Sequence, residues 1–242
     1  MRFLKAVNLS KRYGQRTVVD NLSLEVGSGE TVGLLGPNGA GKTTAFSMII
    51  GLVEADSGQV WLDGEELTGL PAYLRARKGL GFLPQEPSVF RGLSVEENLR
   101  LVLQHQKEAG SSESLKEKVA SLLEDFGLVS LAGSRADRLS GGERRKLEIA
   151  RAMARRPLFL LLDEPFTELD PLAVADLQTI IRKLGERGIG ILLTDHRLRE
   201  ALSVLDRIYI MNGGKIISEG RPEEVLEKKE VREIYLGPGF RL

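Results

Sequence analysis

Two stretches of the sequence carry residues whose types and spacing suit the chemistry of phosphate anhydrides. The first, GPNGAGKTT at residues 36–44, fits the pattern G-x-x-x-x-G-K-[ST] and lies between an apolar run and a helical pattern. In such a loop the glycines let backbone N–H groups surround phosphates, the lysine reaches the β- and γ-phosphates, and the next hydroxyl faces Mg²⁺. We therefore expect a nucleotide cradle made by Gly36, Pro37, Asn38, Gly39, Ala40, Gly41, Lys42, Thr43 and Thr44.

The second stretch, LFLLLDEP at residues 158–165, is an apolar strand that ends in two carboxylates. Neighbouring residues of a strand point to opposite faces of the sheet, so Asp163 and Glu164 should not share one proton. We expect Asp163 to hold Mg²⁺ through its water shell and Glu164 to polarise the attacking water as a general base. Together the two motifs predict a nucleotide-hydrolysing enzyme.

The elements that must position these residues follow from the hydrophobic pattern. Apolar runs of strand length recur at 29–36, 79–85, 158–163, 188–195, 207–214 and 215–220. A helical pattern at 171–188 lies between two of these runs, and this strand–helix–strand order predicts an α/β fold with a parallel sheet. Residues 2–10 and 17–26 alternate apolar and polar side chains, as half-buried strands do.

From about Ser94 to Ala154 the pattern is helical, with candidate helices at 94–106, 113–128 and 141–155. We interpret this region, about 88–157, as a helical lobe inserted in a single domain that spans 1–242. The segment AGSSES at 109–114 is the only plausible flexible loop, and residues 231–242 form a C-terminal tail.

The composition excludes several function classes. Lys+Arg and Asp+Glu both number 34, and a dedicated nucleic-acid binder would normally have a basic excess. The chain contains no cysteine, which fits the cytosol and excludes a thiolate metal site. No apolar run approaches the roughly 20 residues that span a bilayer, so any membrane role must come through a partner.

A third motif, LSGGE at 139–143, resembles the signature of the ATP-binding cassette (ABC) ATPases. The other motifs of that family occur in order: Tyr13 matches the aromatic that stacks on adenine, and Gln85 matches the glutamine that senses Mg²⁺ and the membrane partner. Residues 167–170, TELD, match the D-loop with Asp170 at its end, and His196 matches the switch histidine. The resemblance implies a P-loop NTPase fold with a RecA-like core, an antiparallel β subdomain and an inserted α-helical subdomain.

The same resemblance implies how the site works. It makes Glu164, His196 and Gln85 catalytic, and it assigns Mg²⁺ to Thr43, Gln85 and Asp163. In this family two cassettes pack head to tail, and each ATP lies between one P-loop and the signature of the other copy. This chain should therefore form a homodimer, in which the neighbour's ATP is contacted by Leu139, Ser140, Gly141, Gly142 and Glu143.

Three classes of ABC protein are possible: a transporter subunit, a soluble protein of translation or DNA repair, and a non-hydrolytic binding module. Soluble members usually carry tandem cassettes or long insertions, and binding modules normally lose Lys42, Glu164 or His196. This chain has one motif set and keeps all three residues. The transporter class is therefore favoured.

Within that class the chain resembles the LptB family, the cytoplasmic ATPases of the lipopolysaccharide transporter. The resemblance is carried by residues 75–99, 139–152, 192–202 and 231–242. The alternative is the ATPase of the branched-chain amino acid importer, which often has its switch histidine in an EHD-like context. Here the order is Thr194-Asp195-His196.

The LptB resemblance implies a subunit on the cytoplasmic face of the inner membrane, docked to two membrane subunits like LptF and LptG. The docking groove should have as its walls Leu80, Phe82, Pro87, Phe90, Arg91 and Leu93. Phe90 could equally be part of the core. Thr167 and Glu168 depart from the smaller residues common in the family, and Phe240 in the tail either packs at a dimer or partner surface or frays.

Overall fold

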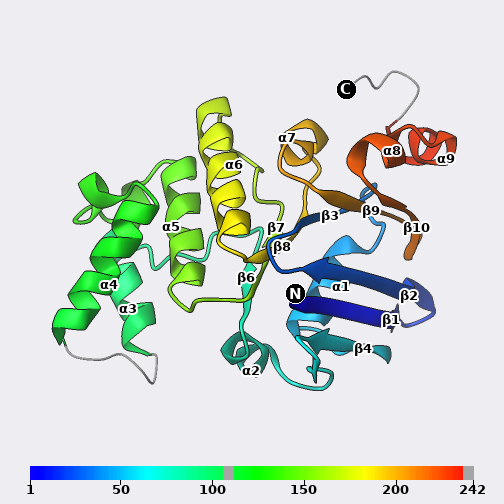
Figure 1. Ribbon diagram of the computed structural model, residues 1–242, viewed down its shortest axis with the longest axis horizontal. Coiled ribbons are helices and arrows are strands. Elements are labelled where there is room, and N and C mark those ends of the chain that lie inside the picture. The colour runs from blue at the N-terminus through cyan, green and yellow to red at the C-terminus, as the bar shows by residue number, and fades with distance from the viewer. Residues whose placement is uncertain (106–111, 237–242) are drawn as a thin grey trace.

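The computed structural model describes residues 1–105 and 112–236, and these build two sheets with helices around them (Figure 1). The larger sheet has six strands in the order β10-β9-β3-β8-β7-β6. Its strands are β3 (Thr31–Leu35), β6 (Leu80–Leu83), β7 (Phe159–Asp163), β8 (Gly190–Thr194), β9 (Arg207–Asn212) and β10 (Lys215–Gly220). All neighbours are parallel except β9 and β10, so the predicted parallel sheet is confirmed.

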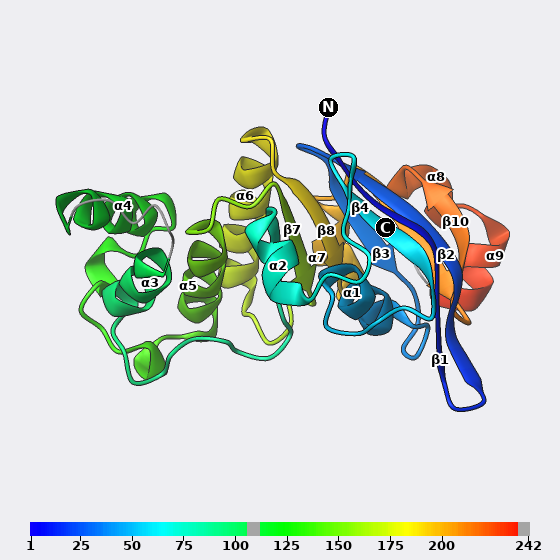
Figure 2. The ribbon, with the colours of Figure 1, turned by 90° about the horizontal axis from the view of Figure 1, so that it is seen from below.

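The smaller sheet is antiparallel and is ordered β2-β1-β4-β5. Its strands are β1 (Phe3–Tyr13), β2 (Arg16–Gly27), β4 (Ser57–Leu62) and β5 (Glu65–Glu66). Figure 2 shows β1, β2 and β4 running together at the side of the large sheet. The alternating pattern of the N-terminal residues therefore did indicate two strands that bury one face each.

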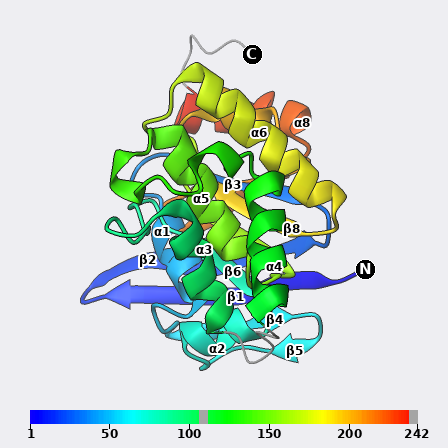
Figure 3. The same cartoon turned by 90° about the vertical axis from the view of Figure 1, so that its left-hand side faces the viewer.

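Three helices pack on the side of the molecule remote from the small sheet: α3 (Val95–Gln104), α4 (Ser112–Asp125) and α5 (Gly141–Met153). Figure 3, viewed from that side, shows them in front of the large sheet. Short 3₁₀ turns at Val129–Leu131 and Ala136–Arg138 connect α4 to α5. These elements fall inside the predicted lobe, whose limits at 88 and 157 stay a prediction.

The remaining helices cover the sheet or follow its last strand. They are α1 (Lys42–Ile50), α2 (Ala72–Arg77), α6 (Pro171–Glu186), α7 (Leu198–Leu202), α8 (Pro222–Leu226) and α9 (Lys229–Val231), with a π-helical turn at Arg232–Leu236. Within the described ranges no helix is both long and apolar enough to cross a bilayer.

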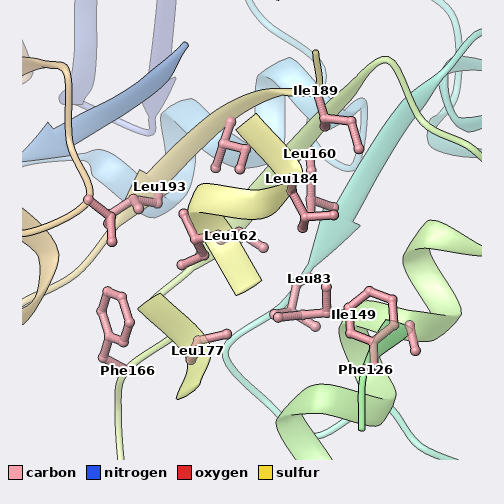
Figure 4. Packing of buried hydrophobic residues seen from close by; sticks show 14 of the residues in the cluster. Leu83, Phe126, Ile149, Leu160, Leu162, Phe166, Leu177, Leu184, Ile189 and Leu193 are labelled. Carbon is pink, nitrogen blue, oxygen red and sulfur yellow. The ribbon is translucent and has the colours of Figure 1, made fainter. Parts of the chain in front are cut away.

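The apolar strands of the large sheet are buried on both faces, which explains their nearly continuous hydrophobic sequences. In β7, Leu160 and Leu162 belong to one hydrophobic cluster, whereas Phe159 and Leu161 belong to another. Figure 4 shows Leu160 and Leu162 packed near Leu177 and Leu184. This two-sided packing holds the end of β7, which carries Asp163 and leads directly into Glu164, in a defined position.

Two predicted segments have ordered structure at one end. The expected loop at 109–114 is helical from Ser112, where α4 begins, and 109–111 lie outside the described residues. The expected tail at 231–242 starts with ordered structure, because Val231 is buried in the core and the chain stays helical to residue 236. Phe240 lies outside the described residues.

Candidate active site

The loop at 36–44 connects β3 to α1, which is the strand–loop–helix context that the motif requires. Its backbone passes so close to neighbouring strands that two positions require glycine. A Cβ at Gly36 would lie 2.0 Å from the carbonyl oxygen of Met211, and one at Gly41 would lie 2.4 Å from that of Val18. Both residues also have φ in the left-handed region, at 149° and 107°. The conformation of the loop therefore depends on glycine at both positions.

Lys42 begins α1 and turns back over the loop. Its Nζ donates to the carbonyl oxygens of Gly36 at 2.7 Å and Pro37 at 3.0 Å. Burial lowers the pKa of Lys42, while the nearby Glu164 and Asp163 carboxylates oppose that change. The ammonium group is thus held above the N-terminus of α1, where backbone N–H groups favour anions.

The two carboxylates at the end of β7 have different surroundings. Asp163 is 6% exposed, and its Oδ1 accepts a 2.6 Å hydrogen bond from the hydroxyl of Thr194 on β8. Burial raises the pKa of Asp163, and the Thr194 hydrogen bond opposes the rise. Glu164 follows with φ 47°, so the chain leaves the strand and directs this side chain elsewhere.

Three polar side chains converge on Oε2 of Glu164. The amide nitrogen of Gln85 donates to it at 3.0 Å, the hydroxyl of Thr167 donates at 3.2 Å, and Nδ1 of His196 lies 3.2 Å away. Gln85 follows β6, Thr167 precedes α6 and His196 follows β8, so three separate segments meet at one carboxylate. The structure therefore brings together three residues that the sequence placed far apart, and adds Thr167 to them.

A buried ion pair on α5 supports this arrangement, and the sequence analysis did not identify it. Arg145 and Glu148 lie 3.0 Å apart, with side chains 8% and 2% exposed. Arg145 also donates to the carbonyl oxygens of Glu164 at 3.0 Å, Pro165 at 3.2 Å and Pro84 at 3.1 Å. The sequence did contain a signal for this pair: opposite charges three residues apart lie on the same side of a helix, and Glu148 falls among the apolar positions of that helix.

The loop after β8 holds the D-loop, which is a second feature that the sequence analysis missed. Asp195 is fully buried and accepts hydrogen bonds from the backbone N–H groups of Phe166 at 2.9 Å and Arg197 at 2.7 Å. Burial raises the pKa of the Asp195 carboxyl. Arg197 donates in turn to the carbonyl oxygens of Phe166 and Leu169. His196 is therefore fixed between two residues that hold the segment carrying Thr167.

The signature residues form the N-terminus of α5. Ser140 is the N-cap, and it and Glu143 form a capping box in which each side chain bonds the other's backbone N–H. Gly142 has to be small, because a Cβ there would lie 2.6 Å from Cβ of Ala173 on α6. The hydrogen bonds described for Leu139 to Glu143 go to this helix and not to the loop at 36–44.

Tyr13 and Asp170 take up simpler positions. Tyr13 ends β1 with 51% of its surface exposed, and the ammonium group of Lys11 lies 5.8 Å from its ring centre. The exposed ring is free to stack on a planar group. Asp170 is the N-cap of α6, where its Oδ1 accepts from the N–H groups of Leu172 and Ala173 at 3.0 Å. This contact alone accounts for an aspartate at the end of the D-loop.

A groove of about 680 Å³ lies between α2, β6, α3 and α5. Three of the six predicted wall residues line it, namely Leu80, Phe82 and Phe90. The other three do not: Pro87 lines a smaller depression beside Gln85, while Arg91 and Leu93 lie on the turn before α3, outside the groove.

Phe90 is 44% exposed and the guanidinium of Arg151 lies 4.6 Å from its ring centre, so it is not a core residue. Arg151 and Arg155 add cationic groups to a largely apolar groove, whose polar lining also includes Ser88, His105 and Glu148. The helix α2, which contributes Ala72, Tyr73 and Ala76 to the groove, was not predicted.

Comparisons with known proteins identify the family. A family model described as ABC transporter matches residues 19–167. The chain is 50% identical over 242 residues to the lipopolysaccharide export system ATP-binding protein LptB of Haemophilus influenzae, and 49% identical to that of Escherichia coli K12. Both alignments cover all of each chain. A probable ABC transporter ATP-binding protein of Azorhizobium caulinodans is 53% identical, with 99% of this chain and 84% of that protein covered.

Solved structures lead to the same fold. A nucleotide-free ATP-binding cassette from an ABC transporter superposes with a TM-score of 0.86 at 30% identity, covering 98% of this chain and 100% of the other. A bacterial ABC transporter cassette solved as a dimer gives a TM-score of 0.79 at 27% identity, covering 90% and 98%.

Proposed function

The chain belongs to the ABC transporter family of ATP-binding subunits, and from that premise we propose that it hydrolyses ATP to power the extraction of lipopolysaccharide from the inner membrane. The support for this substrate is the match of about 50% over the full length to two proteins named for lipopolysaccharide export. A branched-chain amino acid importer is the alternative, and no observation described above favours it.

Glu164 is the general base in this proposal, and the observation that carries the proposal is the convergence of side chains on its Oε2. A general base must be held so that one of its oxygens points at the water whose proton it accepts. The contacts from Gln85, Thr167 and His196 all go to Oε2 of the carboxylate. The proton acceptor in this proposal is therefore the other oxygen, Oε1. With Oε2 held, Oε1 takes the proton of the attacking water.

The loop at 36–44 binds the phosphates. Backbone N–H groups at the start of α1 face the anion, and Lys42 exchanges its two carbonyl contacts for β- and γ-phosphate oxygens. This exchange costs little, because the ammonium group already lies above the loop. Tyr13 supplies an exposed ring for the adenine.

The residues assigned to Mg²⁺ fit that ion by their donor chemistry. Thr43 offers a hydroxyl, Asp163 a carboxylate, and Gln85 an amide oxygen, since its nitrogen faces Glu164. Oxygen ligands with only one or two carboxylates suit Mg²⁺, which keeps water and phosphate in the rest of its shell. When bound, the ion neutralises charge on the phosphates.

We also propose that the active unit is a homodimer with shared sites. The signature residues of each copy face the ATP of the other, which accounts for two phosphate-binding segments in one chain. A dimeric structure among the solved relatives supports this arrangement. Glu168, with φ 60° in the D-loop, and the Thr167 hydroxyl on Glu164 then link the interface to the base.

The groove beside α2 is the docking site for the membrane subunits, which resemble LptF and LptG and hold the chain on the cytoplasmic face. Its largely apolar lining suits the apolar face of a short amphipathic helix, and Arg151 and Arg155 suit a carboxylate on that helix, since the acidic Glu148 of the lining is already paired with Arg145.

Co-purification from a membrane extract tests the proposal. A tagged chain should retain two LptF- and LptG-like subunits, and the complex in proteoliposomes should release lipopolysaccharide to an acceptor only with ATP and Mg²⁺. Retention of amino acid permease subunits instead, or ATP turnover without lipopolysaccharide release, would contradict it.

A further inference from the structure

Arg75 is a buried cation that the proposed catalytic scheme does not use. It is the buried residue of α2 and is 5% exposed. Burial lowers the pKa of its guanidinium. A buried charge is costly unless it is fully hydrogen-bonded, so the groups that bond Arg75 determine which parts of the fold it holds together.

The partners of Arg75 within the described residues are main-chain carbonyl oxygens. Nη1 donates to Met48 at 2.8 Å and to Ile49 at 2.7 Å, and Nε donates to Leu70 at 2.8 Å. Met48 and Ile49 belong to the last turn of α1, whose carbonyl groups carry the partial negative charge of the helix, and the Met48 oxygen also accepts from the N–H of Gly51 at 3.2 Å. The guanidinium is therefore held by the C-terminal end of α1.

The other end of α1 is the phosphate site. The helix begins at Lys42 and Thr43 and has nine residues, so it is a rigid rod about 13 Å long at 1.5 Å per residue. A displacement of its C-terminus therefore moves the N–H groups that face the phosphates.

Arg75 is connected just as directly to the docking groove. Its helix α2 contributes Ala72, Tyr73 and Ala76 to the groove, and the last residue of α1, Ile50, lines it together with Leu52 just beyond. Gly51 lies tightly against Arg75: a Cβ at Gly51 would lie 2.7 Å from Nε of Arg75 and 2.8 Å from the carbonyl oxygen of Leu70. Because the guanidinium is bonded to the end of α1, a helix that shifts α2 should also displace α1.

We propose that Arg75 is a positioning residue that couples the docking groove to the phosphate-binding loop through α1. The coupling acts both ways. If a docked helix changes the affinity of the loop for ATP, then bound ATP changes the affinity of the groove for that helix by the same factor. This inference rests on the proposed role of the groove in docking. ATP binding should then alter α2, even with no membrane subunit present.

Amide hydrogen exchange on the isolated chain tests this coupling. In a Glu164→Gln background, which keeps ATP intact, the amides of residues 74–79 are compared with and without saturating ATP and Mg²⁺. ATP should slow their exchange at least about five-fold, the lower end of usual coupling factors. Arg75→Met keeps the side-chain stem but has no donors, and it should abolish most of that response.

Arg77→Met is the matched control, because Arg77 lies on the same helix, is exposed, and has its guanidinium 5.7 Å from the ring centre of Tyr73. It should keep the wild-type response. Arg75→Lys restores a cation with three donors and should give an intermediate response. This variant decides the matter if Arg75→Met does not fold, which a thermal melt reports.

An unchanged ATP response in Arg75→Met, or an absent response in the parent chain, would overturn the proposal. Equal losses in Arg75→Met and Arg77→Met would mean that α2 merely loosened. The test does not depend on the identity of the docked partner. Failure to co-purify LptF- and LptG-like subunits would contradict the proposed function alone, whereas an unchanged response in Arg75→Met, or no response in the parent chain, contradicts the role of Arg75 alone.

Discussion

Arg145 and Glu148 form an ion pair at 3.0 Å inside the protein, and each also bonds a segment that leads to the base. Glu148 accepts from the N–H of Ser88 at 2.6 Å, while Arg145 donates to the carbonyl oxygens that follow β7. The pair thus joins α5, which begins with the signature, to the segment after β6 and to the segment after β7 of the same copy. A change at the signature can reach Glu164 through these contacts.

We predict that Arg145→Met lowers the free energy of unfolding by about 3–5 kcal/mol, because it leaves Glu148 buried without its counter-ion. Arg145→Met combined with Glu148→Met should recover most of that stability in denaturant unfolding. It should not recover ATP turnover, since the carbonyl oxygens around Glu164 stay unbonded. A double variant with normal turnover would contradict the positioning role.

The pair Asp125–Arg187 gives a prediction that depends on pH. It joins the end of α4 to the C-cap of α6 through bonds of 2.8 and 3.0 Å, and Arg187 lowers the pKa of Asp125 from 3.8. A carboxyl whose folded pKa is depressed stabilises the fold above its ordinary pKa, and the contribution is lost as pH falls through the folded value.

Asp125→Asn should therefore cost about 0.2–1 kcal/mol at pH 7, the range for exposed pairs, and progressively less below the ordinary carboxyl pKa of 3.8. Glu124→Gln, at an exposed neighbour, is the control and should change little. A cost that stays constant down to acid pH, measured by urea unfolding, would rule out the ion pair as its source.

Phe90 gives a prediction about docking. Since the ring is 44% exposed and lines the groove, Phe90→Ala should weaken co-purification of the membrane subunits by about ten-fold or more, as loss of an aromatic anchor does. ATP turnover and melting temperature of the isolated chain should change little. Val129→Ala removes an apolar side chain that is 57% exposed outside the groove, and docking should tolerate it. A marked drop in melting temperature in Phe90→Ala with docking intact would contradict the prediction.

The shared site is testable by mixing two damaged copies. Lys42→Ala removes the phosphate ligand and Ser140→Arg blocks the neighbour's nucleotide, so each homodimer should be nearly inactive. A mixed dimer has one site with both lesions and one intact site. ATP-dependent dimerisation and some phosphate release should return on mixing.

Two differently tagged unmutated copies provide the control for subunit exchange. If they co-assemble while the mixed variants regain neither dimerisation nor turnover, each copy uses its own signature and the shared arrangement is wrong. Because Ser140 also caps α5, the melting temperature of Ser140→Arg must be measured beside these assays.

The sheet strands and the phosphate loop could be predicted because their signals are local. An apolar run such as 158–163 indicates a buried strand, and glycine spacing indicates the loop at 36–44. The contacts that hold Glu164 could not be derived from spacing, because Gln85 and His196 are 79 and 32 residues away from it along the chain. Only the resemblance to a family placed them at the same site.

Other features lacked any local signal. The helix α2 has six residues, too few to show a helical period, so neither its side of the groove nor the role of Arg75 could be predicted. Arg91 and Leu93, which were expected among the walls of the groove, do not line it. The tight turn before α3, where the N–H of Leu93 bonds the carbonyl oxygen of Phe90, directs the chain away from it.

Single-turnover ATP hydrolysis by Glu164→Gln tests the central claim most directly. The glutamine keeps the shape of the side chain and its contact with Thr167, but it cannot accept a proton from water. We predict that ATP still binds and that the closed dimer accumulates, while hydrolysis falls by about 10²-fold or more, as for a lost general base. A rate constant within a few-fold of the unmutated chain, with ATP bound equally tightly, would contradict the assignment of Glu164.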